Sequence, residues 1–304
     1  MRADALGAVL DRRVRIELGT PGPDDLPDVL AALGSWQRDG GPAQLHPGDL
    51  GWNQSFGAEA VAAAVRTWSR DGEVFAVGLL DDPTLIRLAA APTAWHDAEL
   101  AARLVEDVST PARGVLPEGS VAVECRFGGA FRDRLLADGW VYDEPWAPLV
   151  RSLARPVGDC GLRVEVVDPG GVEAVATRVA VHRAAFERST FSSERWHAMA
   201  AGPAYAGARC LVVHDADDVE VAAATVWSAG PGRPGLIEPL GVHREHRGRG
   251  HGTAVTVAAA SVLQGMGSSS VTVCTPSANL GGVATYVRAG FTRLDDSRDL
   301  RRPG

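Results

Sequence analysis

The sequence predicts an α/β (α+β) fold in two similar tandem domains, and three observations carry this prediction. Helical and strand patterns alternate along both halves of the chain. A length of 304 residues suggests two domains of ordinary size. The segments Ser120–Trp140 and Ser270–Phe291 both read as a strand, a helix and a Gly-aromatic pair, and the two pairs lie 151 residues apart. We therefore expect two copies of one fold.

The same offset extends upstream, which indicates an internal repeat. It aligns two further pairs of segments: Leu85-Ile86 with Leu236-Ile237, and the helix Ala98–Val108 with the helix that starts near Gly250. The segment Ser152–Gly161 contains a proline and two glycines and marks the expected boundary. We predict one domain at residues 1–155 and a second at residues 156–304.

Patterning predicts the elements of the C-terminal half in order. Strands are expected at Leu162–Val167, Cys210–His214, Val219–Trp227, Leu236–Val242, Val271–Thr275 and from Phe291 onward. Helices are expected at Gly171–Phe186, Ser193–Met199, Gly250–Leu263 and Leu280–Ala289. The N-terminal half shows a similar alternation, with fewer strands expected in its middle.

The charged residues exclude several classes of protein. All 30 basic residues are Arg, because the sequence contains no Lys. A Walker A phosphate loop, the phosphate-binding Lys of a kinase and a Lys Schiff base each require an ε-amine and are excluded. With 38 acidic residues the formal net charge is -8, which argues against a nucleic-acid or anionic-membrane binder.

Cysteine spacing and hydropathy indicate the compartment. The four cysteines lie far apart without a CxxC pair, which favours a reduced cytoplasmic setting and no cysteine-based metal site. The uncharged stretch Gly252–Val287 is strongly apolar only over Thr253–Leu263, which is too short for a membrane span. We expect a cytoplasmic monomer or homodimer. A signal peptide is not expected, because charges interrupt the N-terminal apolar residues at Asp4, Asp11, Arg12 and Arg13.

The most informative segment is Leu236–Thr253, which reads as a strand, a short loop and the start of a helix. Glycines at positions 248, 250 and 252 leave backbone N–H groups unobstructed at a helix N-terminus. There the free donors and the helix dipole favour an anionic phosphate. Arg247 and Arg249 can add positive charge. The alternative is a solvated basic loop whose glycines serve turn geometry only.

This loop departs from one common phosphate-binding pattern and resembles another. A dinucleotide fingerprint requires G-x-G-x-x-G and an acid about 20 residues further on. The present loop reads G-x-G-x-G, and no acid lies between Gly252 and Asp295. It resembles instead motif A of the GNAT acetyltransferases, Gln/Arg-x-x-Gly-x-Gly/Ala, through Arg247, Gly250 and Gly252.

A second element of the same family follows in order. Asn279, Tyr286 and the pair Gly290-Phe291 are similar to the Asn…Tyr-x-x-x-Gly-Phe helix of GNAT proteins. The resemblance covers approximately residues 162–300, and weakly the N-terminal half through the repeat. It implies a tandem GNAT protein with a layout similar to that of mycothiol synthase. Each domain would then be a mixed, mostly antiparallel twisted sheet flanked by helices.

The repeat predicts which domain is active. At an offset of 151 residues, the positions expected to hold the cofactor or move a proton change residue type in the first half: Arg247 falls on His96, Gly250 on Glu99, Gly252 on Ala101, Glu238 on Arg87 and Tyr286 on Leu135. Glu99 would repel a pyrophosphate. We predict a degenerate N-terminal domain that does not bind acetyl-CoA, and a catalytic C-terminal domain.

The resemblance implies acetyl-CoA as co-substrate and no metal. Pantetheine is expected to pair with the splayed strand at Leu240, Gly241 and Val242, where a backbone N–H polarises the thioester carbonyl. The pyrophosphate is expected at the glycine loop. The remaining cofactor-binding residues implied by the resemblance are Arg247, Gly248, Arg249, Gly250, His251, Gly252, Thr253 and Asn279.

Two residues are expected to be catalytic. Tyr286 stands at the family position that protonates the leaving thiolate, and packing in the core is the alternative. Glu238 shares a strand face with Leu240 and Val242. It is expected to accept the ammonium proton through water or to orient a cationic acceptor, and an ion pair with an Arg is the alternative. A Glu is a poor base at its reference pKa of about 4.3 unless burial raises that pKa.

The acceptor site is the least determined. Trp52, Phe191 and Trp196 are candidate substrate contacts, together with His46 and Asp49 in a Gly/Pro-marked loop; packing or turn chemistry is the alternative for each. The histidines flanking the glycine loop are expected to face solvent or phosphate and to lack the carboxylate spacing of a metal site. They are His243, His246 and His251.

These observations together predict an acetyl-CoA-dependent N-acetyltransferase that acetylates a primary amine of a small molecule by direct attack on the thioester. An antibiotic or a thiol-precursor metabolite is one expected type of acceptor. Two alternatives stay open. One is acetylation of a protein or peptide amine, and the other is a non-catalytic CoA-binding scaffold, against which the intact family positions argue.

Overall fold

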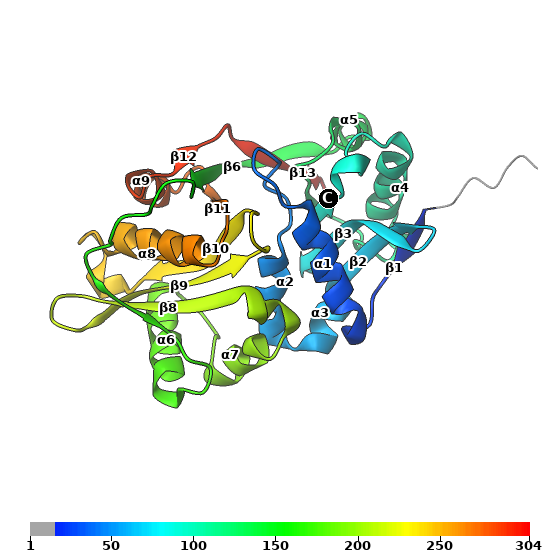
Figure 1. Ribbon diagram of the computed structural model, residues 1–304. Helices are drawn as coiled ribbons and strands as arrows, with labels where there is room; N and C mark the ends of the chain where they lie inside the picture. Colours follow the sequence, from blue (N-terminus) through cyan, green and yellow to red (C-terminus); the bar gives the residue numbers. More distant parts are fainter. Residues whose placement is uncertain (1–15) are drawn as a thin grey trace, which may run out of the picture.

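The computed structural model describes residues 16–304 (Figure 1). The N-terminal residues that bear on a signal peptide lie outside this range. Within it, no helix is long and apolar enough to cross a membrane. The uncharged stretch that begins at Gly252 contributes to three elements: α8 (His251–Gly265), β11 (Ser270–Pro276) and α9 (Leu280–Arg288).

Strands and helices alternate in both halves. The N-terminal half contains β1 (Glu17–Gly19), α1 (Leu26–Trp36), α2 (Pro47–Asn53), α3 (Ala58–Ala64), β2 (Val65–Arg70), β3 (Glu73–Asp82), β4 (Leu85–Ala90), α4 (Ala98–Ser109), β5 (Val121–Glu124), α5 (Gly129–Ala137) and β6 (Val141–Ser152). The C-terminal half adds β7 (Arg163–Val166), α6 (Val172–Ala185), α7 (Ser193–Ala200), β8 (Ala208–His214), β9 (Glu220–Ser228), β10 (Gly235–Val242), β12 (Thr292–Arg293) and β13 (Ser297–Arg302).

The elements predicted in the C-terminal half are confirmed, with the last strand divided into β12 and β13. The expectation of fewer strands in the middle of the N-terminal half is wrong, because β2, β3 and β4 form there. Strand β2 escapes the sequence pattern because it follows the Ala-rich helix α3 directly, with no turn residue between them. Each half therefore contains three consecutive strands at corresponding places, β2–β4 in the first half and β8–β10 in the second.

One continuous sheet joins the halves. Its strand order is β1-β2-β3-β4-β5-β13-β6-β11-β10-β9-β8-β7, and β12 pairs with β6. The order reads the same from either end when each strand is exchanged for its counterpart in the other half, so a pseudo-two-fold axis passes between β13 and β6. The pairs β4–β5 and β10–β11 are parallel, and the others are antiparallel. The predicted mixed, mostly antiparallel α/β fold is confirmed.

The last strand of each half pairs with the other half. Strand β6 pairs with β11, and β13 pairs with β5. The two exchanged strands also pair with each other at the centre of the sheet. Leu300 of β13 belongs to the N-terminal hydrophobic core, whereas Ala147 and Leu149 of β6 belong to a C-terminal one. The domain boundary at residues 155/156 stays a prediction, since each core includes a strand from across it.

Helices cover both faces of the C-terminal part of the sheet (Figure 1). Successive side chains of a strand point to opposite faces. Accordingly, Leu211 and Val213 of β8 pack with residues of α8, whereas Cys210 and Val212 pack with residues of α6 and α7. Helix α8 therefore covers one face, and α6 with α7 covers the other.

Helix α2 of the N-terminal half packs on β9 of the C-terminal half. A Cβ atom on Gly48 would lie 2.5 Å from the Trp227 side chain, and one on Gly51 would also clash with that indole, so this contact requires glycine. The segment expected as a Gly/Pro-marked loop is thus a helix, with Pro47 in its first turn and His46 as its N-cap. The contact holds α2 at the junction of the two halves.

Candidate active site

A cavity of about 960 Å³ lies between the two halves. Three predicted residues of the C-terminal half line it, namely Glu238, Leu240 and Tyr286. Charged and polar residues of the N-terminal half line the same cavity: His46, Asp49, Asp81, Arg87, Glu124 and Arg126. The predicted catalytic residues therefore face a polar wall that the other half supplies.

Strand β10 separates from β11 at this cavity. The two strands pair at Gly235 and Leu236. The pairing of β10 with β9 continues to Val242, past an irregularity between Ile237 and Leu240. Beyond Leu236, the edge of β10 that faces away from β9 is thus open to backbone hydrogen bonds from a ligand. The strand is splayed at the residues where the sequence analysis expected it.

Glu238 lies at the cavity, partly exposed to it but otherwise surrounded by protein. Burial is the main cause that raises its pKa, to about 8. The negative charge of Asp49 and a hydrogen bond between the two carboxyl groups also raise it, whereas Arg87 lowers it. A carboxyl group with this pKa can exchange a proton near neutral pH. The burial that the sequence analysis required for a useful base is therefore present.

Tyr286 lies on α9 and lines the same cavity. Burial, followed by the negative charges of Glu238 and Cys274, raises its pKa to about 12. Its ring centroid lies 5.8 Å from that of Phe291, a contact that helps to orient the phenol. A phenol with this pKa keeps its proton at neutral pH and can donate a hydrogen bond to an anion that forms in the cavity.

Asp49 and Arg87 link the N-terminal half to Glu238. Nη1 of Arg87 lies 2.9 Å from Oδ1 of Asp49, and Nε of Arg87 lies 3.1 Å from a carboxylate oxygen of Glu124. Oδ2 of Asp49 accepts a 2.6 Å hydrogen bond from the backbone N–H of His46. Because both partners hold the Asp49 carboxylate in place, its charge stays directed at Glu238.

His46 has a structural role beside this network. Its Nδ1 accepts a hydrogen bond from the N–H of Gly48 at 2.9 Å, and its Nε2 lies 3.2 Å from the carbonyl oxygen of Pro234. A neutral imidazole with the proton on Nε2 satisfies both contacts. Burial lowers the pKa of His46, which agrees with this neutral form.

Arg126 extends the charge network to Asp299 and Cys274 of the C-terminal half. Its guanidinium lies 3.2 Å from Glu124 and 3.9 Å from Asp299, and it donates a 3.2 Å hydrogen bond to Sγ of Cys274. Burial followed by the charge of Glu124 raises the pKa of Asp299 to about 6. Burial also raises the pKa of the Cys274 thiol to about 11, so this cysteine stays protonated at neutral pH.

Carboxyl groups outnumber guanidinium groups in this network. Arg87 and Arg126 are surrounded by Asp49, Asp81, Glu124, Glu238 and Asp299. Carboxyl groups also outnumber guanidinium groups over the whole cavity lining. Like charges at short range disfavour full ionisation, which contributes to the raised pKa values of Glu238 and Asp299. A cation that enters the cavity would relieve this excess of negative charge.

Helix α8 begins with free backbone donors. The preceding loop places Gly248 and Gly250 at φ values of 79° and 89°, which favour glycine. The N–H of Ala254 makes a hydrogen bond to Gly250, and no side chain caps the helix. Arg249 is exposed on the loop. An anion can therefore bind the three amides that precede Ala254, those of His251, Gly252 and Thr253.

Two residues expected to contact the cofactor make hydrogen bonds within the protein. Nη2 of Arg247 donates a 2.7 Å hydrogen bond to the carbonyl oxygen of Ala185, so its guanidinium lies at the C-terminus of α6. Oδ1 of Asn279 accepts from the N–H of Gly282 at 3.1 Å, and Nδ2 donates to Thr275 at 3.0 Å. Asn279 thereby caps α9 and fixes the helix that carries Tyr286.

The corresponding helix of the N-terminal half is already capped. Oδ1 of Asp97 accepts hydrogen bonds from the N–H groups of Glu99 and Leu100, at 2.9 and 3.0 Å. Arg70 lies 3.0 Å from Asp97 and 3.1 Å from Glu99. Leu135, at the position that corresponds to Tyr286, is fully buried. The start of α4 therefore has its amides occupied and carries negative charge.

The three aromatic candidates for acceptor contact lie in a hydrophobic cluster. Phe191 and Trp196 are fully buried, and the Trp52 ring stacks on Phe191 with centroids 4.9 Å apart. Of the described residues, the cavity lining includes none of these three. The structure favours packing over acceptor contact for all of them. Asp49, which the sequence analysis placed beside Trp52, does reach the cavity.

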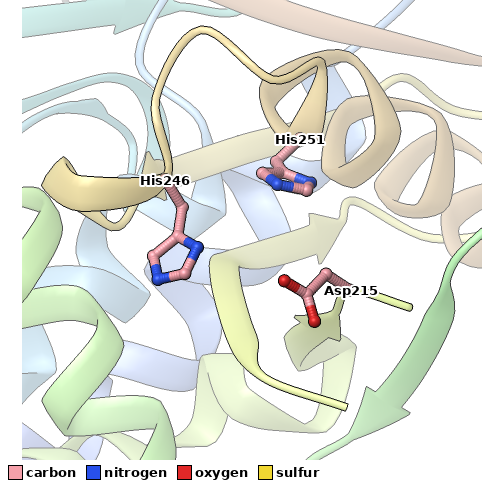
Figure 2. A group of neighbouring side chains, drawn as sticks. All are labelled: Asp215, His246 and His251. Carbon is pink, nitrogen blue, oxygen red and sulfur yellow. The ribbon is translucent and has the colours of Figure 1, made fainter. Parts of the chain in front are cut away.

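Figure 2 shows Asp215, His246 and His251 facing one space. Their ligand atoms all lie within 4.8 Å of one another. The expectation that these histidines lack a carboxylate at metal-ligand spacing is therefore wrong. Asp215 lies 31 residues before His246 in the chain, and the β8–β9 turn brings it close. Local spacing cannot reveal such a partner.

Most of the charged residues that line the cavity were not predicted from the sequence. The sequence does contain one signal for Arg87, because this residue corresponds to Glu238 at the repeat offset. Corresponding residues near a pseudo-two-fold axis lie close together, and Arg87 does interact with Glu238. The remaining residues carry no such signal, since strand exchange brings their segments together. They are Asp81, Glu124, Arg126, Cys274 and Asp299.

Residues 178–291 match the model of the Acetyltransferase (GNAT) family. The match begins within α6 and ends at Phe291, and it includes Glu238, α8 and Tyr286. A search of curated proteins finds no match to the chain.

Solved structures with the same fold extend over the whole chain. A GCN5-related N-acetyltransferase from Sphaerobacter thermophilus is 20% identical with a TM-score of 0.55, covering 97% of this chain and 96% of that one. A tandem GNAT protein from the clavulanic acid biosynthesis pathway is 16% identical with a TM-score of 0.59, covering 95% and 98%. A GNAT-family acetyltransferase from Colwellia psychrerythraea is 12% identical with a TM-score of 0.57, covering 94% and 98%. These likenesses establish the tandem fold.

Proposed function

Because residues 178–291 match the model of the GNAT acetyltransferase family, we propose that this chain is an acetyl-CoA-dependent N-acetyltransferase acting on a primary amine of a small molecule. One observation carries the proposal. The cavity between the halves joins the open edge of β10 to Glu238 and Tyr286. A binding edge, a proton acceptor and a hydrogen-bond donor thus face one space.

In this proposal, acetyl-CoA binds along the edge of β10 that separates from β11 and extends to the start of α8. Its pyrophosphate accepts hydrogen bonds from the free amides at the start of α8, and Arg249 adds positive charge. Its pantetheine amides pair with the open edge of Leu240–Val242. A backbone N–H on that edge stabilises the oxyanion that forms on the thioester carbonyl.

The acceptor enters as an ammonium ion, which the excess of carboxyl groups in the cavity favours. Glu238, in its ionised form, accepts one proton from it, directly or through water. The free amine nitrogen then attacks the carbonyl carbon and forms a tetrahedral intermediate. The nitrogen of this intermediate loses its second proton to water, the C–S bond breaks, and CoA leaves as a thiolate. Asp49 acts as a positioning residue, because its charge and hydrogen bond raise the pKa of Glu238.

Tyr286 stabilises the leaving thiolate. Complete proton transfer from a phenol with a pKa of about 12 to a thiolate whose thiol has a reference pKa of about 8.5 costs about 5 kcal/mol. Donation of a hydrogen bond, with the proton later supplied by water, avoids most of that cost. The role proposed for Tyr286 is therefore hydrogen bonding in the transition state.

The two halves divide the work in this proposal. Residues 156–304 bind acetyl-CoA and supply Glu238 and Tyr286. Residues 1–155 bind no acetyl-CoA, since Asp97 occupies the amides of α4 and Glu99 adds negative charge. They contribute charged residues that line the acceptor site, among them Asp49 and Arg87.

The proposal is tested by thiol release from acetyl-CoA with a panel of small amines. The wild-type protein should release CoA with at least one of them. Tyr286→Phe should lower kcat by about 100-fold, the scale of a lost acid–base group, while the calorimetric affinity for acetyl-CoA is retained. Tyr142→Phe, at an exposed tyrosine, is the matched control and should keep full activity.

Other outcomes distinguish the alternatives. Turnover with peptide amines only would identify a protein acetyltransferase. Binding of CoA without turnover on any amine would identify a scaffold. Full activity in Tyr286→Phe would exclude the role assigned to that phenol.

A further inference from the structure

We propose that Asp215, His246 and His251 form a binding site for a divalent transition-metal ion such as Zn²⁺. The three side chains come from separate segments: the β8–β9 turn, the short helix Arg244–His246 and the start of α8. Their ligand atoms lie within 4.8 Å of one another, and Figure 2 shows them facing a common space. No residue of this cluster lines the cavity described above.

The two imidazoles have buried nitrogens that lack hydrogen-bond partners. Nδ1 of His246 and Nε2 of His251 are inaccessible to solvent, and neither is hydrogen-bonded to any residue that the structure describes. His251 is 9% exposed. Buried polar atoms are normally paired, so unpaired ones point to a missing ligand. A metal ion would satisfy both nitrogens with one bond each.

The carboxylate of Asp215 is already oriented for such an ion. Its Oδ1 accepts hydrogen bonds from the N–H groups of Asp217 and Val219, both at 3.0 Å. Backbone donors of this kind fix the carboxylates that coordinate metals in many sites. These bonds hold one oxygen and leave Oδ2 available as a ligand.

Loop geometry brings the two histidines together. Gly248 and Gly250 adopt positive φ values of 79° and 89°, which let the chain turn back between His246 and His251. In a tetrahedral site, zinc bonds of about 2.0–2.2 Å place two ligand atoms about 3.3–3.6 Å apart. Ligand atoms at the observed limit of 4.8 Å would therefore approach each other by about 1 Å on binding the ion, a shift that side-chain rotation can supply.

The donor set selects the class of metal. Two imidazole nitrogens and one carboxylate oxygen suit Zn²⁺, Co²⁺, Ni²⁺ or Fe²⁺, whereas Mg²⁺ and Ca²⁺ prefer oxygen ligands alone. Three protein ligands leave further coordination positions open to water or to an added anion. A bound ion would join the β8–β9 turn to the start of α8.

The test is Zn²⁺ binding by calorimetry to protein freed of metals with a chelator. One Zn²⁺ should bind per chain and raise the Tm, because it binds the folded state. Loss of a residue that only orients a ligand costs about 10–100-fold in affinity, so Asp215→Asn and His246→Gln should each weaken binding by at least about tenfold. Mg²⁺ should not compete. His197→Gln, at an exposed histidine outside the cluster, is the matched control and should bind as the wild type does.

Spectroscopy locates the ion. Co²⁺ should give a visible absorption band in the wild-type protein that is absent in Asp215→Asn, whose Asn can still accept the turn hydrogen bonds. No binding of Zn²⁺ to the wild-type protein would overturn the proposal. So would unchanged affinity in both Asp215→Asn and His246→Gln, since the ion would then lie at other residues. Acetyl-CoA takes no part in these measurements, so their result is independent of the proposed enzyme activity.

Discussion

Glu238 illustrates how a single side chain can reduce stability and serve chemistry at once. Burial and Asp49 raise its pKa from 4.5 to about 8. Between these two values the folded protein holds a proton at Glu238 that the unfolded chain has released. The free energy of unfolding therefore falls as the pH rises through this window, and the contribution of Glu238 levels off above the folded pKa. The same raised pKa that lowers the free energy of unfolding allows Glu238 to accept a proton near neutral pH.

Glu238→Gln should separate these two effects. Glutamine stays neutral, so the variant should be more stable than the wild type at pH 8, and similar to it near pH 4, where both side chains are uncharged. Its kcat should fall by about 100-fold, because the proton acceptor is lost. Urea unfolding at the two pH values, together with thiol release, measures both effects. An equal change in stability at both pH values would show that the pKa of Glu238 is not raised in the folded protein. Glu245→Gln, at an exposed position, should change neither quantity.

At the scale of elements, the repeat contains two corresponding helices, α4 and α8, whose N-termini differ in charge and capping. Helix α8 starts after Gly250 with free amides, whereas α4 starts after Asp97, whose carboxylate occupies two amides. The fold holds both helices in corresponding positions, and the first turn alone differs in charge and capping. A few residues at the helix start thus account for the expectation that one half binds an anion and the other does not.

Thr253→Glu tests this difference in the first turn of α8. The added carboxylate should weaken acetyl-CoA binding by at least about tenfold through repulsion of the pyrophosphate. The same charge near a helix N-terminus should leave the free energy of unfolding unchanged or raise it by about 0.3–1 kcal/mol. Calorimetry and urea unfolding give the two values. Thr253→Gln has the same size without the charge, and equal weakening by that variant would point to a steric cause instead.

At the scale of the whole molecule, strand exchange makes each half depend on the other. Strand β13 completes the N-terminal core through Leu300, and β6 completes a C-terminal core through Ala147 and Leu149. The cavity lies beside these central strands, so its walls come from both halves. The N-terminal half, whose corresponding helix is capped by Asp97, thus provides part of the cavity wall.

Leu300→Ala tests this dependence. The substitution removes a side chain that is 1% exposed, and it should lower the free energy of unfolding by about 2–5 kcal/mol. Both halves should unfold in one transition, seen as coincident urea curves by far-ultraviolet circular dichroism and tryptophan fluorescence. Leu294→Ala, at a leucine that is 46% exposed in the same segment, should change stability far less. Separate transitions for the two signals would contradict the coupling.

The local pattern of the sequence determined the order of most helices and strands and the place of the main motifs. Periodicity, turn residues and motif order predict four features: the repeat offset, the C-terminal elements, the glycine loop before α8, and the positions of Tyr286 and Glu238. These features depend on neighbours within a few residues, which the sequence displays directly. Strand β2 was missed because the adjoining Ala-rich helix obscures where the periodicity changes.

Only the tertiary structure decided which residues share the cavity and the histidine cluster. Asp49 meets Glu238 because α2 packs on Trp227, and Arg126 meets Cys274 because β13 and β6 cross between the halves. Asp215 joins His246 and His251 through a hairpin turn. Burial, and with it the raised pKa of Glu238, appears only when these distant segments pack together. A pKa depends on the charges and the solvent around a group, and neither can be read from its neighbours in sequence.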